Sequence, residues 1–188
     1  STQGYSSAAS DVYKRQMYKN AFLVRPELKH AEQIRAYRQE FLDCGDSMDG
    51  SGSLRKRKNP AEWLTDVEMC SRKETVPSDW VQSTQFIYVR KNDGKIVGMI
   101  DVRHYFNDFL AKYAGHIGYS VCPSERKKGY AAAMLRETLP YCKEIGLKKV
   151  MISCADDNMG SRKTILKNGG VYAVSYTHLR AHETRSNL

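Results

Sequence analysis

The chain has 188 residues, of which 30 are Lys or Arg and 21 are Asp or Glu, so its formal net charge at pH 7 is +9. Hydrophobic residues make up 41% of the sequence, which is enough for the core of one domain, and no apolar run is long enough to span a membrane. The five cysteines form no Cys-x-x-Cys pair, so we expect a reduced cytoplasmic protein without a metal site.

The N-terminal third of the chain predicts one strand followed by two helices. Residues 22–25 have the composition of a short strand. Pro26 is typical of a first helical position, and apolar residues follow it at helical spacing as far as Phe41. After a polar loop, Asn59-Pro60 predicts the start of a second helix.

The middle of the chain predicts three strands. Residues 84–90 alternate as a strand does, and Asn92-Asp93-Gly94 is typical of a hairpin turn into a second strand over residues 96–104. A loop then leads to a further strand over residues 116–121.

The last part of the chain predicts helix, strand and helix. A helix follows Gly129 and contains Pro140, where we expect a bend because proline removes one backbone hydrogen bond. Residues 149–153 predict a strand, and residues 158–168 predict the last helix. The resulting order, β-α-α-β-β-β-α-β-α, indicates an α/β (α+β) fold.

The turn before the first of these helices has the features of an anion site. Arg126, Lys127 and Lys128 supply positive charge, and Gly129 lets the backbone approach a ligand closely. The helix begins near Tyr130 and Ala131, and a helix N-terminus presents unpaired N–H groups to an anion. Neither Gly-x-x-x-x-Gly-Lys-Ser/Thr nor Gly-x-Gly-x-x-Gly is present, so two other phosphate loops are excluded. A basic helix start without a ligand is the alternative interpretation.

A second polar position lies at the start of the last helix. Asn158 follows an acidic turn, and Ser161 lies one helical turn later. Asn is among the best N-cap residues, so capping alone would explain Asn158. Binding of a ligand by the same side chain is compatible with that role.

Together these two segments resemble the GNAT (GCN5-related N-acetyltransferase) superfamily, in particular a bacterial branch of predicted acetyltransferases. The resemblance rests on Arg126-x-x-Gly129-x-Ala131 and on Asn158 with Ser161, and it covers roughly residues 20–170. It implies a mixed central sheet with helices on both faces and acetyl-CoA as co-substrate. It also implies that residues 126–131 bind the pyrophosphate, that Asn158 and Ser161 lie at the pantetheine arm, and that main-chain groups around Tyr119 and Val121 bond it.

The resemblance further implies transfer of the acetyl group to an amine by direct attack within a ternary complex. The family's usual general acid, a Tyr seven residues after the Asn, is replaced here by Ile165. Tyr119 and Tyr172 are candidate substitutes. His104 and His116 are candidate bases because imidazole titrates near neutral pH, and both could equally be structural residues at strand ends.

We expect the acceptor to be a small-molecule primary amine. The alternatives are a protein N-terminus or lysine, and an acyl-CoA-binding module without activity. Basic residues are dispersed, without interleaved aromatic residues, so we expect no nucleic-acid or membrane partner; a nucleic-acid-binding domain would bind with strong salt dependence. The family resemblance also makes a homodimer a possible oligomeric state.

The two ends of the chain look foreign to this domain. Residues 11–16 and 174–179 resemble the two translations of one sequencing-adaptor DNA. We therefore expect residues 1–16 to be an artefactual or disordered tail and residues 174–188 to be an artefactual one. The domain between them, residues 17–173, is expected to begin at Met17 without a signal peptide. Family members continue with two more strands, so we expect this copy to be truncated.

Overall fold

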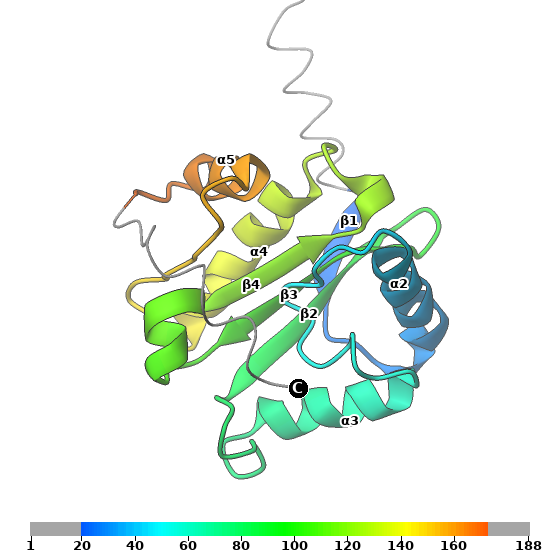
Figure 1. Cartoon of the computed structure of the whole chain (residues 1–188), viewed down its shortest axis with the longest axis horizontal. Helices are drawn as coiled ribbons and strands as arrows, with labels where there is room; N and C mark the ends of the chain where they lie inside the picture. The colour runs from blue at the N-terminus through cyan, green and yellow to red at the C-terminus, as the bar shows by residue number, and fades with distance from the viewer. Residues whose placement is uncertain (1–19, 173–188) are drawn as a thin grey trace, which may run out of the picture.

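A four-stranded antiparallel sheet is the centre of the fold. The computed structural model describes residues 20–172, and in it the strands lie side by side in the order of the chain (Figure 1). They are β1 (Ala21–Val24), β2 (Ser83–Arg90), β3 (Ile96–Arg103) and β4 (Ile117–Val121). Consecutive strands pair throughout, so β1 and β4 are the two edges of the sheet within the described residues.

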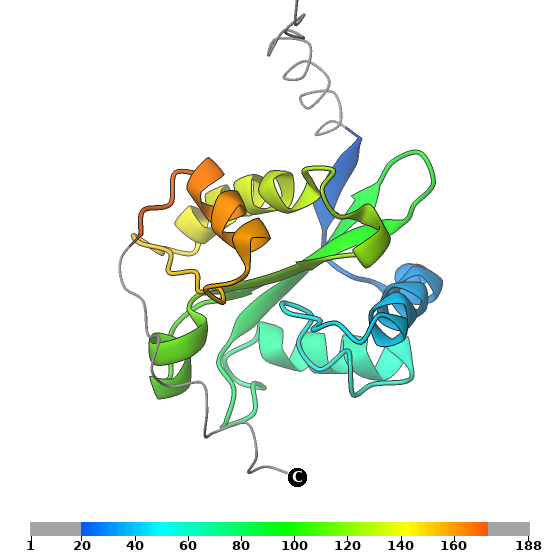
Figure 2. The ribbon, with the colours of Figure 1, turned by 45° about the horizontal axis from the view of Figure 1, so that its top comes forward.

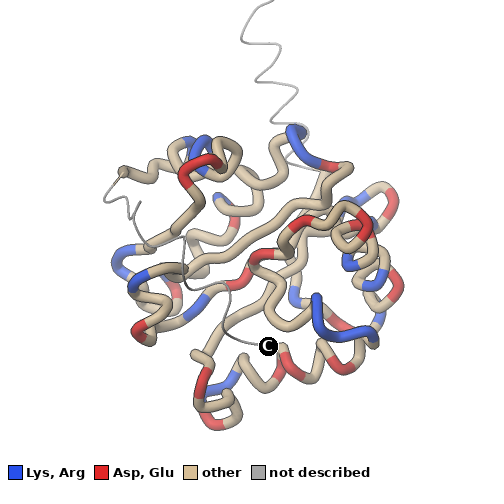
Figure 3. The backbone as a smooth tube through the Cα atoms, in the orientation of Figure 1, with Lys and Arg blue, Asp and Glu red and all other residues tan. Residues whose placement is uncertain are grey.

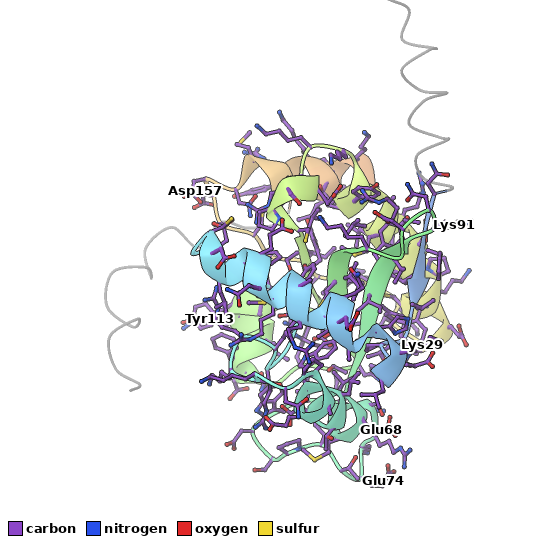
Figure 4. All side chains as sticks on the ribbon, turned by 90° about the vertical axis from the view of Figure 1, so that its right-hand side faces the viewer. Lys29, Glu68, Glu74, Lys91, Tyr113 and Asp157 are labelled. Carbon is purple, nitrogen blue, oxygen red and sulfur yellow. The ribbon has the colours of Figure 1, made fainter. Side chains whose placement is uncertain are left out.

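Helices cover both faces of this sheet (Figure 2). One face carries α2 (Ala31–Asp43), preceded by the 3-10 turn η1 (Leu28–His30), and α3 (Pro60–Ser71). The other face carries α4 (Tyr130–Glu144) and α5 (Met159–Lys167). In Figure 4, accordingly, Glu68 on α3 and Asp157 before α5 lie on opposite sides of the sheet. Two short turns, η2 (Leu110–Ala114) and η3 (Pro123–Glu125), flank β4 in the sequence.

Each face has its own hydrophobic core. β3 is buried along almost its whole length, because its two sets of alternate side chains pack against different helices. The core beneath α2 and α3 includes Tyr37, Phe41, Trp63, Ile87 and Met99. The core beneath α4 includes Tyr88, Ile100, Ile117, Met134 and Leu135. The fold class expected from the sequence, a sheet with helices on both faces, is thereby confirmed.

The first helical segment begins later than the proline pattern predicts. Pro26 lies in extended chain, and the cap is Glu27, whose backbone N–H donates to His30 Nδ1 at 3.0 Å. This reciprocal cap satisfies the first helical N–H groups, so the helix starts at Leu28 rather than at the proline. At the second helix the prediction is confirmed, since Asn59 Oδ1 accepts from the Ala61 N–H at 3.0 Å with Pro60 at the first helical position.

The predicted strand over residues 149–153 does not form a ladder. Its one pairing among residues 20–172 is an isolated bridge between Gly115 and Ile152. The His116 N–H donates to the Met151 carbonyl at 2.8 Å, and the Met151 N–H donates to the His116 imidazole Nδ1 at 3.0 Å. A side chain thus takes the hydrogen bond that a second backbone pair would have made. The bridge itself is antiparallel, and the described sheet is antiparallel, not mixed as the family resemblance implied.

Helix α4 runs unbroken through Pro140 from Tyr130 to Glu144. Pro140 is exposed, so water can hydrate the carbonyl group that has lost its N–H donor. The bend expected there stays a prediction. Both tail segments expected from the sequence, residues 1–16 and 174–188, lie outside the described residues, and the truncation expected near residue 173 stays a prediction. Within residues 20–172, no helix is both long and apolar enough to cross a membrane.

Candidate functional site: the open edge of strand β4 and the loop before helix α4

Strand β4 presents main-chain groups at the edge of the sheet. The Arg103 N–H donates to the His116 carbonyl, and the Cys122 N–H donates to the Val97 carbonyl, at 2.8 and 2.9 Å. Even-numbered residues of β4 therefore bond β3, and the N–H and C=O groups of the odd-numbered residues point away from it. Tyr119 lies in the middle of this outward row. The edge can thus pair with an extended, amide-containing ligand as another strand would.

The Tyr119 side chain connects β4 to helix α5. Its hydroxyl lies 2.7 Å from Ser161 Oγ. Burial raises the pKa of Tyr119 above its ordinary value, and the hydrogen bond with Ser161 opposes this only in part. The phenol is consequently neutral at pH 7 and available as a hydrogen-bond donor. The structure brings together two residues that the sequence predicted separately.

Asn158 caps helix α5. Its Oδ1 accepts from the Ser161 N–H at 3.0 Å, which confirms the capping role. The side chain is exposed at the end of the helix that lies beside Tyr119. Its predicted contact with a cofactor stays a prediction.

The loop before α4 has the backbone of an anion site. Gly129 is the N-cap residue with φ 88°, and Lys127 has φ 63°, a left-handed conformation that is uncommon for a residue with a side chain. Successive N–H groups in such a turn converge on one side, next to the positive end of the 15-residue helix α4. Figure 3 shows the run of basic residues at this position, directly after an acidic one.

The three cationic side chains of the loop do not act alike. Arg126 turns toward α2: its NH1 donates to Asp46 Oδ2 at 2.7 Å, and its guanidinium lies 5.7 Å from the Phe41 ring centroid. Lys128 Nζ donates to Glu125 Oε2 at 2.8 Å. Lys127 is exposed. Two of the three cationic side chains of the loop, Arg126 and Lys128, therefore form ion pairs with carboxylates.

Two buried or half-buried carboxylates, those of Glu125 and Glu40, hold the loop before α4 in place. Glu125 is buried and accepts from Arg90 NH1 at 2.9 Å and from Lys95 Nζ at 3.1 Å, in addition to Lys128. Glu40 on α2 accepts from the Ser124 N–H at 2.7 Å. The sequence did not indicate the pairs with Arg90 and Lys95, because these two residues come from a hairpin 30 or more residues away.

Replacing Glu125 by Gln should destabilise the protein in a pH-dependent way. Burial would raise the pKa of Glu125, but hydrogen bonds from Lys128 and Lys95 outweigh it and hold the pKa below the ordinary value of 4.5. A lowered folded-state pKa stabilises the fold above pH 4.5, and this contribution is lost as the pH falls through the folded value.

We therefore expect Glu125→Gln to reduce the free energy of unfolding by about 2 kcal/mol at pH 7, with the difference from wild type vanishing in acid. Urea titrations at pH 7, 5 and 3.5 measure this difference. The exposed Glu144→Gln, at the far end of α4, is the matched control. A difference that persists unchanged at the lowest pH would contradict the assignment of the stabilisation to the ionised carboxylate.

The two candidate histidines lie in separate environments. His104 Nε2 lies 2.9 Å from Thr84 Oγ1, and its ring packs edge-on against Tyr141 of α4. His116 accepts the Met151 N–H and stacks on Phe106 at 4.0 Å between ring centroids. Burial lowers the pKa of each imidazole, so both are neutral near pH 7. The structure does not bring them together on one group, and neither lines the cavity described next.

A cavity of about 410 Å³ lies on the α3 side of the sheet, beside β4. Its walls come from β2, β3, α3, the loop between α2 and α3, the segment between α3 and β2, and the segment after β3. They include Gly50, Trp63, Trp80, Asp101, Arg103 and Phe109. The main chain of Gly50 packs directly on Gly118 of β4, where an added Cβ would lie 2.1 Å from the Gly118 oxygen. The cavity and the open edge of β4 are thus neighbours.

Asp101 forms part of the sheet side of this cavity. The residue is 8% exposed, and its carboxylate lies 3.4 Å from Arg103 Nε. Burial raises the pKa of Asp101. Most other cavity residues were missed because the loop over residues 48–53 has no periodic pattern, and only its glycines signal close packing. Among residues 20–172, no group of three or more His, Cys, Asp or Glu side chains could hold a metal ion.

Several solved structures of acetyltransferases share this fold. A putative ribosomal-protein-serine acetyltransferase from Vibrio cholerae matches with a TM-score of 0.55 and 17% identity, over 80% of this chain and 79% of that one. The ribosomal-protein-S5-alanine acetyltransferase from Vibrio fischeri matches with a TM-score of 0.59 and 21% identity over the same shares. The microcin C7 self-immunity acetyltransferase MccE, solved with acetyl-CoA and AMP, matches with a TM-score of 0.53 and 17% identity, over 80% of this chain and 78% of that one. The fold is that of N-acetyltransferases.

The family follows from the sequence itself. The sequence model of the acetyltransferase (GNAT) family matches residues 55–169, and the chain belongs to this family. It is accordingly an acetyltransferase with acetyl-CoA as co-substrate, which confirms the resemblance found in the loop before α4 and at Asn158. Comparison with curated protein sequences yields no match.

Proposed function

We propose that this protein transfers the acetyl group of acetyl-CoA to the primary amine of a small molecule, by direct attack within a ternary complex. The observation that carries the proposal is the continuity of three features: the outward main chain of β4 at Tyr119, the turn from Lys127 to Gly129, and the cavity on the other side of Gly118. A cofactor along the first two would place its thioester beside the third.

The cofactor would be held mainly by backbone. Amides of the pantetheine arm pair with the outward N–H and C=O groups of β4, and Asn158 supplies a side-chain amide at the same edge. The pyrophosphate takes the N–H groups of the Gly129–Ala131 turn and the positive end of α4. Charge from Lys127 and Lys128 adds to this field.

The chemistry needs one proton removed from the acceptor and one delivered to the leaving group. The amine nitrogen bonds to the thioester carbonyl carbon, the carbon–sulfur bond breaks, and the CoA thiolate is protonated. Tyr119, protonated at pH 7, is our candidate donor to that sulfur, in place of the Tyr that Ile165 replaces. His116 and His104 are our candidate bases. In the neutral His116 ring the basic nitrogen is Nδ1, which accepts the Met151 N–H, so taking a proton from the amine requires that this hydrogen bond be given up.

Acetylation of a protein N-terminus or lysine is the second candidate function. The observation that favours it is the similarity of fold to two proteins named as ribosomal-protein acetyltransferases. An acyl-CoA-binding module without activity is the third.

Calorimetric titration with acetyl-CoA, followed by thiol release over a panel of amines and peptides, tests the proposal. We expect micromolar binding and thiol release with small amines. Binding with thiol release only for peptides would favour the protein acceptor, and binding without release for any acceptor would favour the binding module. A folded protein that does not bind acetyl-CoA would contradict all three.

A further inference from the structure

The cavity beside β4 has a charge opposite to that of the chain as a whole. The chain carries a formal charge of +9, yet the cavity lining holds four carboxylates and a single guanidinium. Asp66 is already paired with Arg57, at 2.6 Å between Oδ2 and Nε. The other carboxylates are Asp49 and Asp79, which are exposed, and Asp101, which is buried at the sheet.

The same cavity has apolar walls between its carboxylates. Both tryptophans of the sequence line it: Trp63 is fully buried, whereas Trp80 is 47% exposed. Phe109 lines it as well and is largely exposed. Exposed aromatic rings among carboxylates provide both a surface for methylene groups and π-faces for cations.

The polar groups of the cavity differ in how far they are already satisfied. The Arg103 guanidinium is held by the Gly115 carbonyl at 3.1 Å and by Asp101, and it lies against Gly118 of β4. It is therefore engaged with the protein on the side that faces β4. Asp79 has no such cationic partner within the described residues and lies at the outer side of the cavity next to Trp80.

From this arrangement we infer that the acceptor is a linear aliphatic diamine or polyamine. One ammonium group binds among Asp79, Asp49 and the Trp80 ring, and the methylene stem lies along the apolar wall. The reacting amine extends past Gly50 and Arg103 toward β4. This inference rests on the proposed function and names its acceptor. The carboxylates disfavour an anionic acceptor. A monoamine loses its only positive charge when its nitrogen is deprotonated for attack, and would then leave the carboxylates without a counter-charge.

The reaction then balances without a further reagent. The reacting end of the diamine gives up one proton and its nitrogen bonds to the acetyl carbon, while the carbon–sulfur bond breaks and the CoA sulfur gains a proton. A second proton, that of the ammonium form, goes to solvent. The product amide has lost one positive charge, so it binds the carboxylates less tightly than the substrate and is released.

Tryptophan signals test the inference without requiring turnover. The full chain has two indole N–H groups, and both belong to the cavity. In ¹H–¹⁵N spectra we expect 1,4-diaminobutane and spermidine to shift the Trp80 indole signal at concentrations about tenfold lower than 1-aminobutane, which has the same stem and one charge fewer. The preference should weaken with added salt.

Three substitutions sharpen the test. Asp79→Asn, at the exposed side of the cavity, should reduce the preference for diamine over monoamine about threefold or more. Asp101→Asn should also reduce this preference. If the buried Asp101→Asn variant does not fold, the result for Asp79→Asn alone decides the test. Asp108→Asn, an exposed carboxylate outside the cavity lining, should leave it unchanged. With acetyl-CoA present, the same preference should appear in kcat/KM for thiol release.

Equal responses to diamine and monoamine, or none to either, would overturn the inference even if acetyl-CoA binds and small amines are acetylated. Faster acetylation of a peptide N-terminus than of any diamine would overturn it too. Absence of acetyl-CoA binding in calorimetry would instead contradict the proposed function, while the indole titration would still decide which ligand class the cavity takes.

Discussion

Replacing Gly129 by Glu should abolish acetyl-CoA binding while leaving the protein folded. Gly129 caps α4 with φ 88°, so any side chain there costs about 1–2 kcal/mol of backbone strain. A carboxylate at a helix N-terminus regains part of this through the helix dipole and the neighbouring lysines. The same carboxylate would occupy the N–H groups that a pyrophosphate needs, and repel it. We expect at least a hundredfold loss of affinity, equivalent to about 2.8 kcal/mol, measured by calorimetry.

Gly146→Glu is the matched control for this substitution. Gly146 follows the other end of α4 with φ 86°, and a side chain there would meet no heavy atom within 4 Å. The backbone strain and the added charge are the same, but the anion loop is untouched. Equal affinities for the two variants would show that the turn before α4 is not where the cofactor phosphates bind. Thermal melting of both variants establishes that they are folded.

Replacing Gly50 by Ala should destabilise the protein far more than the addition of one methyl group normally does. An added Cβ would lie 2.1 Å from the Gly118 oxygen and 2.6 Å from the Tyr119 Cα, so the loop must move off β4. That movement breaks contacts that hold the loop, including the bonds from Gln85 Nε2 to the Gly50 carbonyl at 2.8 Å and from Ser120 Oγ to the Asp49 carbonyl at 2.6 Å. We expect a loss of about 3–5 kcal/mol in the free energy of unfolding, measured in urea.

Gly52→Ala separates this clash from backbone strain. Gly52 lies in the same loop with φ 56°, and nothing lies within 4 Å of its added Cβ. We expect it to cost only about 1–2 kcal/mol. Similar losses for the two variants would mean that the loop is not seated on β4 in solution. In the Gly50 variant, the indole signals of Trp63 and Trp80 should also shift, because Trp63 Nε1 donates to the Ser51 carbonyl in this loop.

The sequence predicted well the features that depend on neighbouring residues. Helix α3 has its cap in Asn59-Pro60, and the hairpin between β2 and β3 has its turn residues in place. Gly129 has the left-handed backbone that suits the close approach expected of it, while the role of this turn as an anion site stays a prediction. In each case the physical cause lies within a few residues, where periodicity and capping rules apply.

Features that depend on distant partners were predicted poorly. Residues 149–153 have strand composition, but only a partner strand makes a ladder, and the His116 side chain takes the hydrogen bond instead. Arg126 was expected at the mouth of the anion site, whereas Asp46, 80 residues away, draws its guanidinium toward α2. The cavity could not be foreseen at all, because Asp79, Asp101 and Phe109 come from segments without a shared pattern.

The packing of Gly50 on Gly118 affects which substitutions such a protein can accept during evolution. The contact between Gly50 and Gly118 is made by backbone atoms and does not depend on the identity of the surrounding side chains. Asp49, Ser53 and their neighbours could therefore be substituted while the loop stays packed on β4. The cofactor binding that we propose at the open edge of the same strand would be left intact by such exchanges. New acceptors could therefore be explored by mutation while the acetyl donor stays the same.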